Sequence, residues 1–222
     1  MKKEERLYFI GLLLFIITLG SCSGSDNDAY VTTITIPEEQ DEECCNAEET
    51  FLAYAFLNNG YVKEIEALRD TIDEAYELRV YSANGNFHVG YNELFFSLTK
   101  LSNGGYVRDF TVTGVRPLMT MTSMGMTHSA PAQTEAVLYD ATFPAVRKAW
   151  VSFLMSSGES GYWELSYSAS TGGKSVDHGA TIVTVEALTE EQNWLKSFKI
   201  GSEVYYLSLV NPLDLQVGSN TI

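Results

Sequence analysis

The stretch Tyr162-Trp-Glu-Leu-Ser-Tyr-Ser-Ala169 places an apolar side chain at every second position, beginning with Trp163. Successive side chains of a β-strand point to opposite faces of the sheet, whereas a helix repeats its apolar positions every three to four residues. The stretch therefore predicts a strand with one face against a core and the other face toward solvent.

Six further runs of this kind surround the first and predict six more strands. They are Tyr76–Ser82, Asn92–Leu101, Arg108–Val115, Glu135–Asp140, Lys148–Ser156 and Gly179–Glu186. Glycine and asparagine occupy the breaks between them, as at Asn84-Gly85 and Gly172-Gly173, and favour tight turns. Seven short strands without a long helical period predict an all-β fold of the sandwich kind.

Two features of this region leave alternatives open. The segment Val62–Ile72 fits either an acidic helix or an edge hairpin, so residues 51–75 form an uncertain lead-in. Aromatic residues in the predicted strands are expected in the core, although an exposed row of them would favour a glycan platform. They are Phe95, Trp150, Phe153, Trp163 and Tyr167.

The N-terminus has the organisation of an export signal. Basic residues precede an apolar run from Leu7 to Leu19, which is shorter than the roughly 20 residues of a membrane-spanning helix. The following Leu19-Gly-Ser-Cys22 resembles the processing site of bacterial lipoproteins. We expect residues 1–21 to be removed and Cys22 to carry lipid, which would anchor the protein to the outer membrane on its periplasmic or cell-surface face.

Residues 22–50 are rich in acidic and small polar side chains and predict a tether with little fixed structure. The adjacent Cys44 and Cys45 are expected to form mixed disulfides or a strained bond with each other more readily than a Cu(I) site. The formal net charge of −15 repels phosphate and argues against nucleic acid as a partner.

The segment Pro117-Leu-Met-Thr-Met-Thr-Ser-Met-Gly-Met-Thr-His128 contains four of the six methionines of the chain. Thioethers select Cu(I), and imidazole serves both copper oxidation states. An extended backbone would place the methionines of each pair on one face, and Gly125 permits a bend between the pairs. The predicted copper ligands are Met119, Met121, Met124, Met126 and His128.

The alternative is a metal-free structural, adhesion or assembly module that binds an envelope protein, in which the methionines are adaptable packing. This alternative predicts methionines that are excluded from solvent in the folded domain or in a complex with the partner. Enzymatic activity is not expected, because no metalloprotease, serine-hydrolase, phosphate-loop or dinucleotide motif occurs. His88 is expected to pack in a strand, and His178 is expected in an exposed turn.

Several segments together resemble the YtkA-like domain family. They are Val89-Gly-Tyr-Asn-Glu-Leu94, Val107-Arg-Asp-Phe-Thr-Val112, Pro117-Leu-Met119, His128-Ser-Ala-Pro131 and Gly161-Tyr-Trp-Glu-Leu165. The resemblance implies an immunoglobulin-like sandwich over residues 76–190 in an exported protein, in a family with some members near copper systems. Leu118 and Thr120 interrupt the paired methionines that are frequent in that family, which puts some donor positions in doubt.

An internal echo suggests a second domain. Val89-Gly-Tyr-Asn-Glu-Leu94 returns as Val217-Gly-Ser-Asn-Thr-Ile222, and strand-like segments of equal length precede both copies. We expect residues 191–222 to contain a linker and the first strands of a truncated second repeat. The alternative is that Val204–Ile222 adds edge strands to the first domain.

Overall fold

The computed structural model describes residues 44–189, 195–208 and 210. All of them belong to one compact unit. The predicted signal peptide, the lipidation residue Cys22 and the repeated motif Val217–Ile222 lie outside the described residues. These three features therefore stay predictions.

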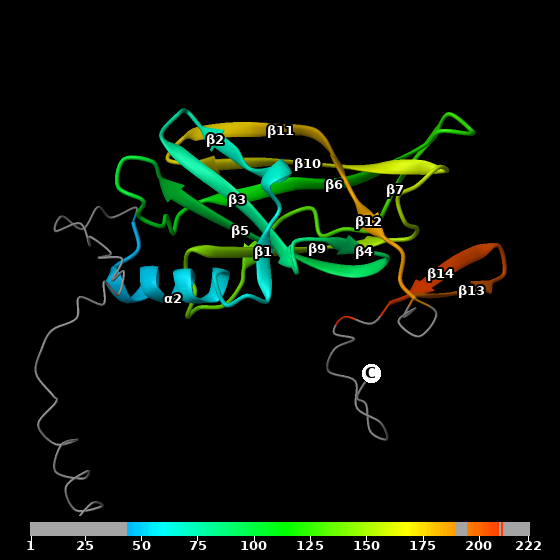
Figure 1. Ribbon diagram of the computed structural model, residues 1–222, viewed down its shortest axis with the longest axis horizontal. Coiled ribbons are helices and arrows are strands. Elements are labelled where there is room, and N and C mark those ends of the chain that lie inside the picture. The colour runs from blue at the N-terminus through cyan, green and yellow to red at the C-terminus, as the bar shows by residue number, and fades with distance from the viewer. Residues whose placement is uncertain (1–43, 190–194, 209, 211–222) are drawn as a thin grey trace, which may run out of the picture. The chain divides into compact units, whose positions relative to one another are not determined.

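Strands β1, β2, β3, β5, β8 and β9 form the first antiparallel sheet (Figure 1). Its path runs β1-β3-β5-β9-β8, and β2 also pairs with β3. The bounds are Val62–Glu64 for β1, Asp70–Ile72 for β2, Tyr76–Ala83 for β3, Gly90–Lys100 for β5, Val137–Leu138 for β8 and Val146–Phe153 for β9. The central strand β5 pairs with β3 and β9 along most of its length.

Strands β6, β7, β10 and β11 form the second antiparallel sheet, in the order β11-β10-β6-β7. Their bounds are Thr111–Met121, Met126–Ser129, Gly161–Thr171 and Lys174–Val183. Two small pairs complete the strands. Strand β4 (Phe87–His88) lies parallel to β12 (Val185–Glu186), and β13 (Lys196–Ile200) pairs with β14 (Glu203–Leu207).

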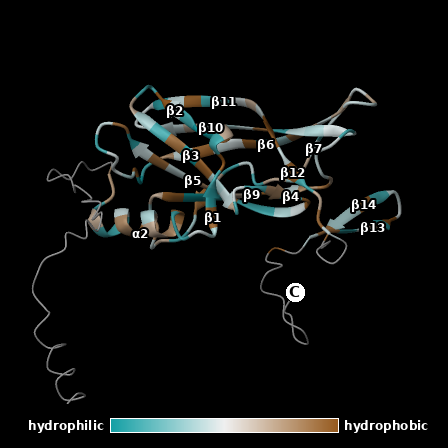
Figure 2. Cartoon of the chain, viewed as in Figure 1, coloured by the Kyte–Doolittle hydropathy of each residue, from teal (hydrophilic) through white to brown (hydrophobic). Residues whose placement is uncertain are grey.

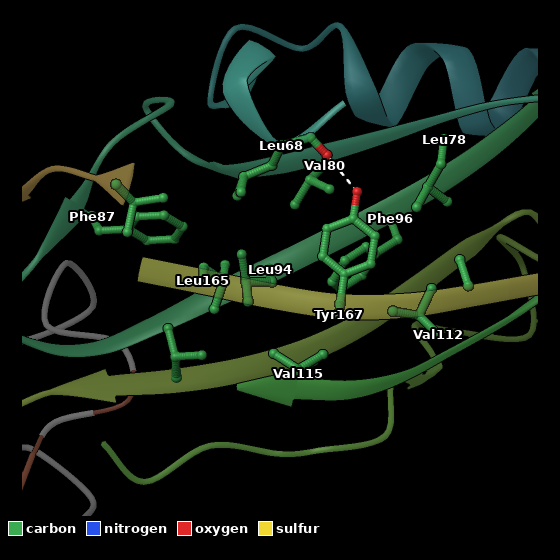
Figure 3. Close-up of a cluster of buried hydrophobic side chains, with 14 of the residues drawn as sticks. Leu68, Leu78, Val80, Phe87, Leu94, Phe96, Val112, Val115, Leu165 and Tyr167 are labelled. Atoms are coloured by element: carbon green, nitrogen blue, oxygen red, sulfur yellow. Dashed lines mark hydrogen bonds between the residues drawn. The ribbon is translucent and has the colours of Figure 1, made fainter. Parts of the chain in front are cut away.

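The main core lies between the two sheets and explains the alternation in the sequence. Along β10 the residues are alternately buried and half-exposed, and Trp163, Leu165 and Tyr167 point inward. They meet Leu94 and Phe96 from the first sheet (Figure 3). Hydrophilic and hydrophobic residues alternate along the strands in Figure 2. The predicted all-β sandwich is confirmed.

The outer face of the first sheet is also covered, by helix α2 (Ala47–Leu57). Asn46 caps the helix by accepting from the Glu49 amide, and the Glu49 carboxylate accepts from the Asn46 amide in return. Ala53 and Leu57 pack in a second cluster with Phe95. The helix begins within residues 22–50, where composition predicted little fixed structure, because a capping box and an apolar docking face offset the acidity.

The segment Val62–Ile72, for which the sequence allowed either an acidic helix or an edge hairpin, forms two edge strands. Strands β1 and β2 pair with opposite ends of β3, and the 3₁₀ turn η1 (Glu66–Leu68) separates them. The buried hydroxyl of Tyr167 donates to the Leu68 carbonyl at 2.5 Å, as the dashed line in Figure 3 shows. This segment therefore ties the edge of the first sheet to the second sheet.

Four of the five aromatic residues expected in the core are buried there, and Trp150 is the exception. Its side chain lies on the outer face of β9, opposite the inward Val151 and Phe153, and stacks on Tyr91 with ring centroids 5.8 Å apart. The alternation along β9 accounts for this orientation, because Trp150 and Val151 must point to opposite faces.

Replacement of Tyr167 by phenylalanine should lower the free energy of unfolding by about 1–2 kcal/mol, because the buried Leu68 carbonyl loses its donor. Urea unfolding followed by circular dichroism measures the effect. Tyr162→Phe is the matched control, since Tyr162 lies on the solvated face of the same strand. Equal stability of the two variants would show that the bond between Tyr167 and Leu68 does not hold the lead-in segment.

Candidate functional site

The methionine-rich segment forms the β6–β7 hairpin at the edge of the second sheet. Met121 lies directly opposite Met126, and Met119 lies directly opposite His128. A four-residue turn joins the strands, with Gly125 at a φ of 61° and its amide donating to the Met121 carbonyl at 3.0 Å. The extended backbone expected for the first methionine pair is confirmed.

The register gathers four of the predicted ligands on one face of the hairpin. Residues two apart in a strand share a face, and so do directly opposed residues of paired strands. Met119, Met121, Met126 and His128 therefore point to the same side. Directly opposed Cβ atoms are roughly 4.5–5.5 Å apart, a separation that flexible thioethers close without moving the backbone.

Burial divides these residues into two groups. Met119 is 1% exposed and belongs to the main core, and Met121 is half-buried against that core. Met124 in the turn is 55% exposed and Met126 is 45% exposed. His128 is also exposed. One end of the methionine face is thus part of the sandwich interior, and the other end meets solvent.

The loop before β10 holds the turn of the hairpin. Thr122 donates its amide to the Ser160 carbonyl at 3.2 Å and its hydroxyl to the Glu159 carbonyl at 2.8 Å. Gly161 lies opposite Met121, and a Cβ at this position would come within 2.4 Å of the Thr120 carbonyl oxygen. Glycine is therefore needed there for the close approach of β10 to β6.

Replacement of Gly161 by alanine should destabilise the fold by about 1–3 kcal/mol, because the new methyl group also lies 2.8 Å from the Met119 Cε atom. Thermal unfolding measures the change. Gly158→Ala is the control, because a Cβ at Gly158 meets no atom within 4 Å. A Gly161→Ala variant as stable as Gly158→Ala would contradict the close packing of β10 on β6.

Other metal donors are poorly placed in the described part of the chain. No group of three or more His, Cys, Asp or Glu side chains there is arranged to hold a metal ion. Cys44 and Cys45 are both partly buried. Burial, aided by Glu49, raises the pKa of the Cys45 thiol to about 11. Because the thiolate is the metal ligand, this environment disfavours copper at Cys45.

His178 lies in strand β11 and not in the exposed turn that the sequence predicted. Its Nδ1 atom lies 2.8 Å from the Asp70 carboxylate, and its Nε2 atom lies 3.0 Å from the Thr181 hydroxyl. The ring stacks on Tyr167 at 4.7 Å between centroids. These contacts link β2 of the first sheet to β11 of the second sheet. The His178 side chain therefore helps to hold the two sheets together.

His88 has the packing role that the sequence favoured. It lies in β4 beside Glu186 of β12, and its amide donates to the Asn92 side chain at 3.0 Å. Burial lowers the pKa of the His88 imidazole below its ordinary value, and the nearby Glu186 only partly opposes this shift. The folded protein therefore favours the neutral ring.

A histidine with a lowered folded-state pKa binds its proton more readily in the unfolded chain. His88 should therefore reduce stability as the pH falls below its ordinary pKa of 6.5, and this cost should be absent well above that value. When the pH falls from about 7.5 to about 5.5, the free energy of unfolding should decrease less for His88→Gln than for the parent. Urea unfolding at both pH values checks this, and equal losses would rule out a buried neutral His88.

Comparisons with known protein families, with curated proteins and with solved structures find no match for this chain. Among the described residues, no helix is both long and apolar enough to cross a bilayer. The argument for function therefore depends on the chemistry of the residues themselves, and the methionine hairpin has the most distinctive donor set.

Proposed function

We propose that this protein is a lipid-anchored protein of the bacterial cell envelope that binds Cu(I) through the β6–β7 hairpin. The observation that carries the proposal is the register, in which Met121 opposes Met126 and His128 follows on the same face. Two thioethers and one imidazole form a donor set that suits Cu(I). Met124, in the adjoining turn, is a candidate for a fourth donor.

Met119 has a different role in this proposal. Its burial at 1% exposure makes it a core residue, so we leave it out of the ligand set. Its contribution is to hold β6 in place, which fixes the direction of Met121 two residues later. The ligands are then Met121, Met126 and His128, with Met124 at the turn.

The solvent exposure of Met124 and Met126 supports metal binding over packing within the domain. Packing within the folded domain predicts methionines that are excluded from solvent, whereas Met124 and Met126 are about half exposed. Leucine would fill an apolar gap with a less oxidisable side chain, so exposed thioethers point to use of the sulfur itself. The net charge of −15 adds a weak, unselective attraction for cations.

The location and the family are part of the same proposal. The sequence Leu19-Gly-Ser-Cys22 supports lipid attachment at Cys22 in the outer membrane, with an acidic tether between the lipid and the sandwich. The segments that resemble YtkA-like domains support an immunoglobulin-like relationship. Thioethers bind copper without losing a proton, so sulfur binding should persist in mild acid.

Simultaneous replacement of Met121 and Met126 by leucine should weaken Cu(I) binding at least about tenfold, since two of the three main donors are removed. Titration with Cu(I) against a competing chromophoric chelator measures the affinity. Met155→Leu is the matched control, because Met155 is 40% exposed and lies outside the hairpin. The Cu(I) affinity of the Met155→Leu variant should equal that of the parent.

Met119→Leu separates packing from ligation. The change conserves volume and should cost less than about 1.5 kcal/mol of stability while Cu(I) affinity stays the same. Cu(I) affinity that is unchanged in the Met121 and Met126 double variant would overturn the proposal. Met124→Leu alone then shows whether the turn supplies a fourth donor.

A further inference from the structure

A second candidate site lies on the other side of the first sheet, among residues that the copper proposal does not use. It is a cleft of about 510 Å³ between helix α2, strand β1 and the outer face of β3. Its lining includes Tyr54, Asn58, Lys63, Arg79, Tyr81 and Tyr106. Small-molecule sites typically have volumes of about 300–1,000 Å³.

The turn between helix α2 and strand β1 creates this cleft. Helix α2 ends at Leu57, and Gly60 at a φ of 83° turns the chain into β1, which pairs with β3. The helix packs on Phe95, whereas the neighbouring Arg79 and Tyr81 of β3 remain at the floor of the cleft. Tyr106 approaches from the loop after β5 and pairs with Thr99.

Three phenol rings line the cleft at different depths. Tyr54 is 50% exposed and Tyr81 is 6% exposed, and Tyr106 is intermediate. Burial raises the pKa of Tyr106 to about 12, so its hydroxyl stays neutral near pH 7. Within the described part of the chain, the hydroxyl groups of Tyr54 and Tyr106 have no hydrogen-bond partner. The cleft therefore offers flat ring faces together with neutral donors and acceptors.

The charges of the cleft argue against an ionic ligand. Arg79 donates to Glu77 at 2.6 Å, and Glu64 accepts from Arg69 at 2.7 Å, so both charges already have opposite partners. Lys63 disfavours a cation, and the overall charge of −15 disfavours an anion. The polar groups on the walls also disfavour a wholly apolar ligand.

We propose that this cleft binds a neutral saccharide. A pyranose ring combines an apolar C–H face with hydroxyl groups at its edge, which matches aromatic faces surrounded by hydrogen-bonding groups. The exposed ring of Tyr54 supplies the stacking surface. The hydroxyl of Tyr106 binds the hydroxyl groups of the sugar. The side-chain amide of Asn58 donates one N–H to the Tyr54 carbonyl at 2.8 Å and has a second N–H and an oxygen to offer the sugar.

Isothermal titration of the intact chain with cellohexaose, maltohexaose, mannohexaose and chitohexaose tests the proposal, with hexagalacturonate as the acidic comparison. At least one neutral oligosaccharide should bind. Tyr54→Ala should weaken that binding about tenfold through loss of the stacking face. Tyr106→Phe should weaken it about fivefold, because the ring stays and only the hydroxyl is lost.

Two control variants separate the cleft from nonspecific binding. Tyr205→Ala removes a ring that is 44% exposed and lies outside the cleft, and Tyr162→Phe removes a hydroxyl from the second sheet. Both should bind as the parent does. The proposal is overturned if no neutral oligosaccharide binds, if hexagalacturonate alone binds, or if Tyr54→Ala and Tyr106→Phe leave the affinity unchanged.

Discussion

The burial of Met119 between the two sheets determines which face each later residue of the β6–β7 hairpin presents. Side chains alternate strictly along a strand, so a slip of one residue would move Met119 to the outside and carry Met121 with it. Gly161 accommodates this register, because a Cβ there would come within 2.4 Å of the Thr120 carbonyl oxygen and 2.8 Å of the Met119 Cε atom. The ligand face proposed for copper is therefore a consequence of core packing.

The sandwich also depends on a first sheet that is covered on both sides. Residues Leu94–Leu98 of β5 are all buried, so neither face of this part of the central strand meets solvent. The second sheet covers one face and α2 covers the other. The lead-in segment closes the edge of the sandwich through Leu68 and Asp70, which contact Tyr167 and His178 of the second sheet. The cleft that we assign to a saccharide lies where α2 leaves the sheet uncovered.

The sequence predicted the parts of this structure that follow from local periodicity. Alternation located the main strands, and the extended backbone at Met119 and Met121 followed from the same rule. Alternation did not distinguish the buried Met119 from the half-buried Met121, because both lie on one face of β6. Their burial differs only through the extent of the opposing sheet. The bond between His178 and Asp70 joins residues 108 positions apart, for which a single sequence carries no signal. The capping pair Asn46 and Glu49 was a local signal for α2 that the acidic composition obscured.

The position of copper in crystals of the Cu(I)-loaded protein tests the central claim most directly. Anomalous diffraction collected on either side of the copper absorption edge locates the metal without assumptions about its ligands. The account predicts one strong peak at the β6–β7 hairpin, in contact with the side chains of Met121, Met126 and His128. A peak at Cys44 and Cys45, or no peak in crystals of protein that was loaded with Cu(I), would contradict it.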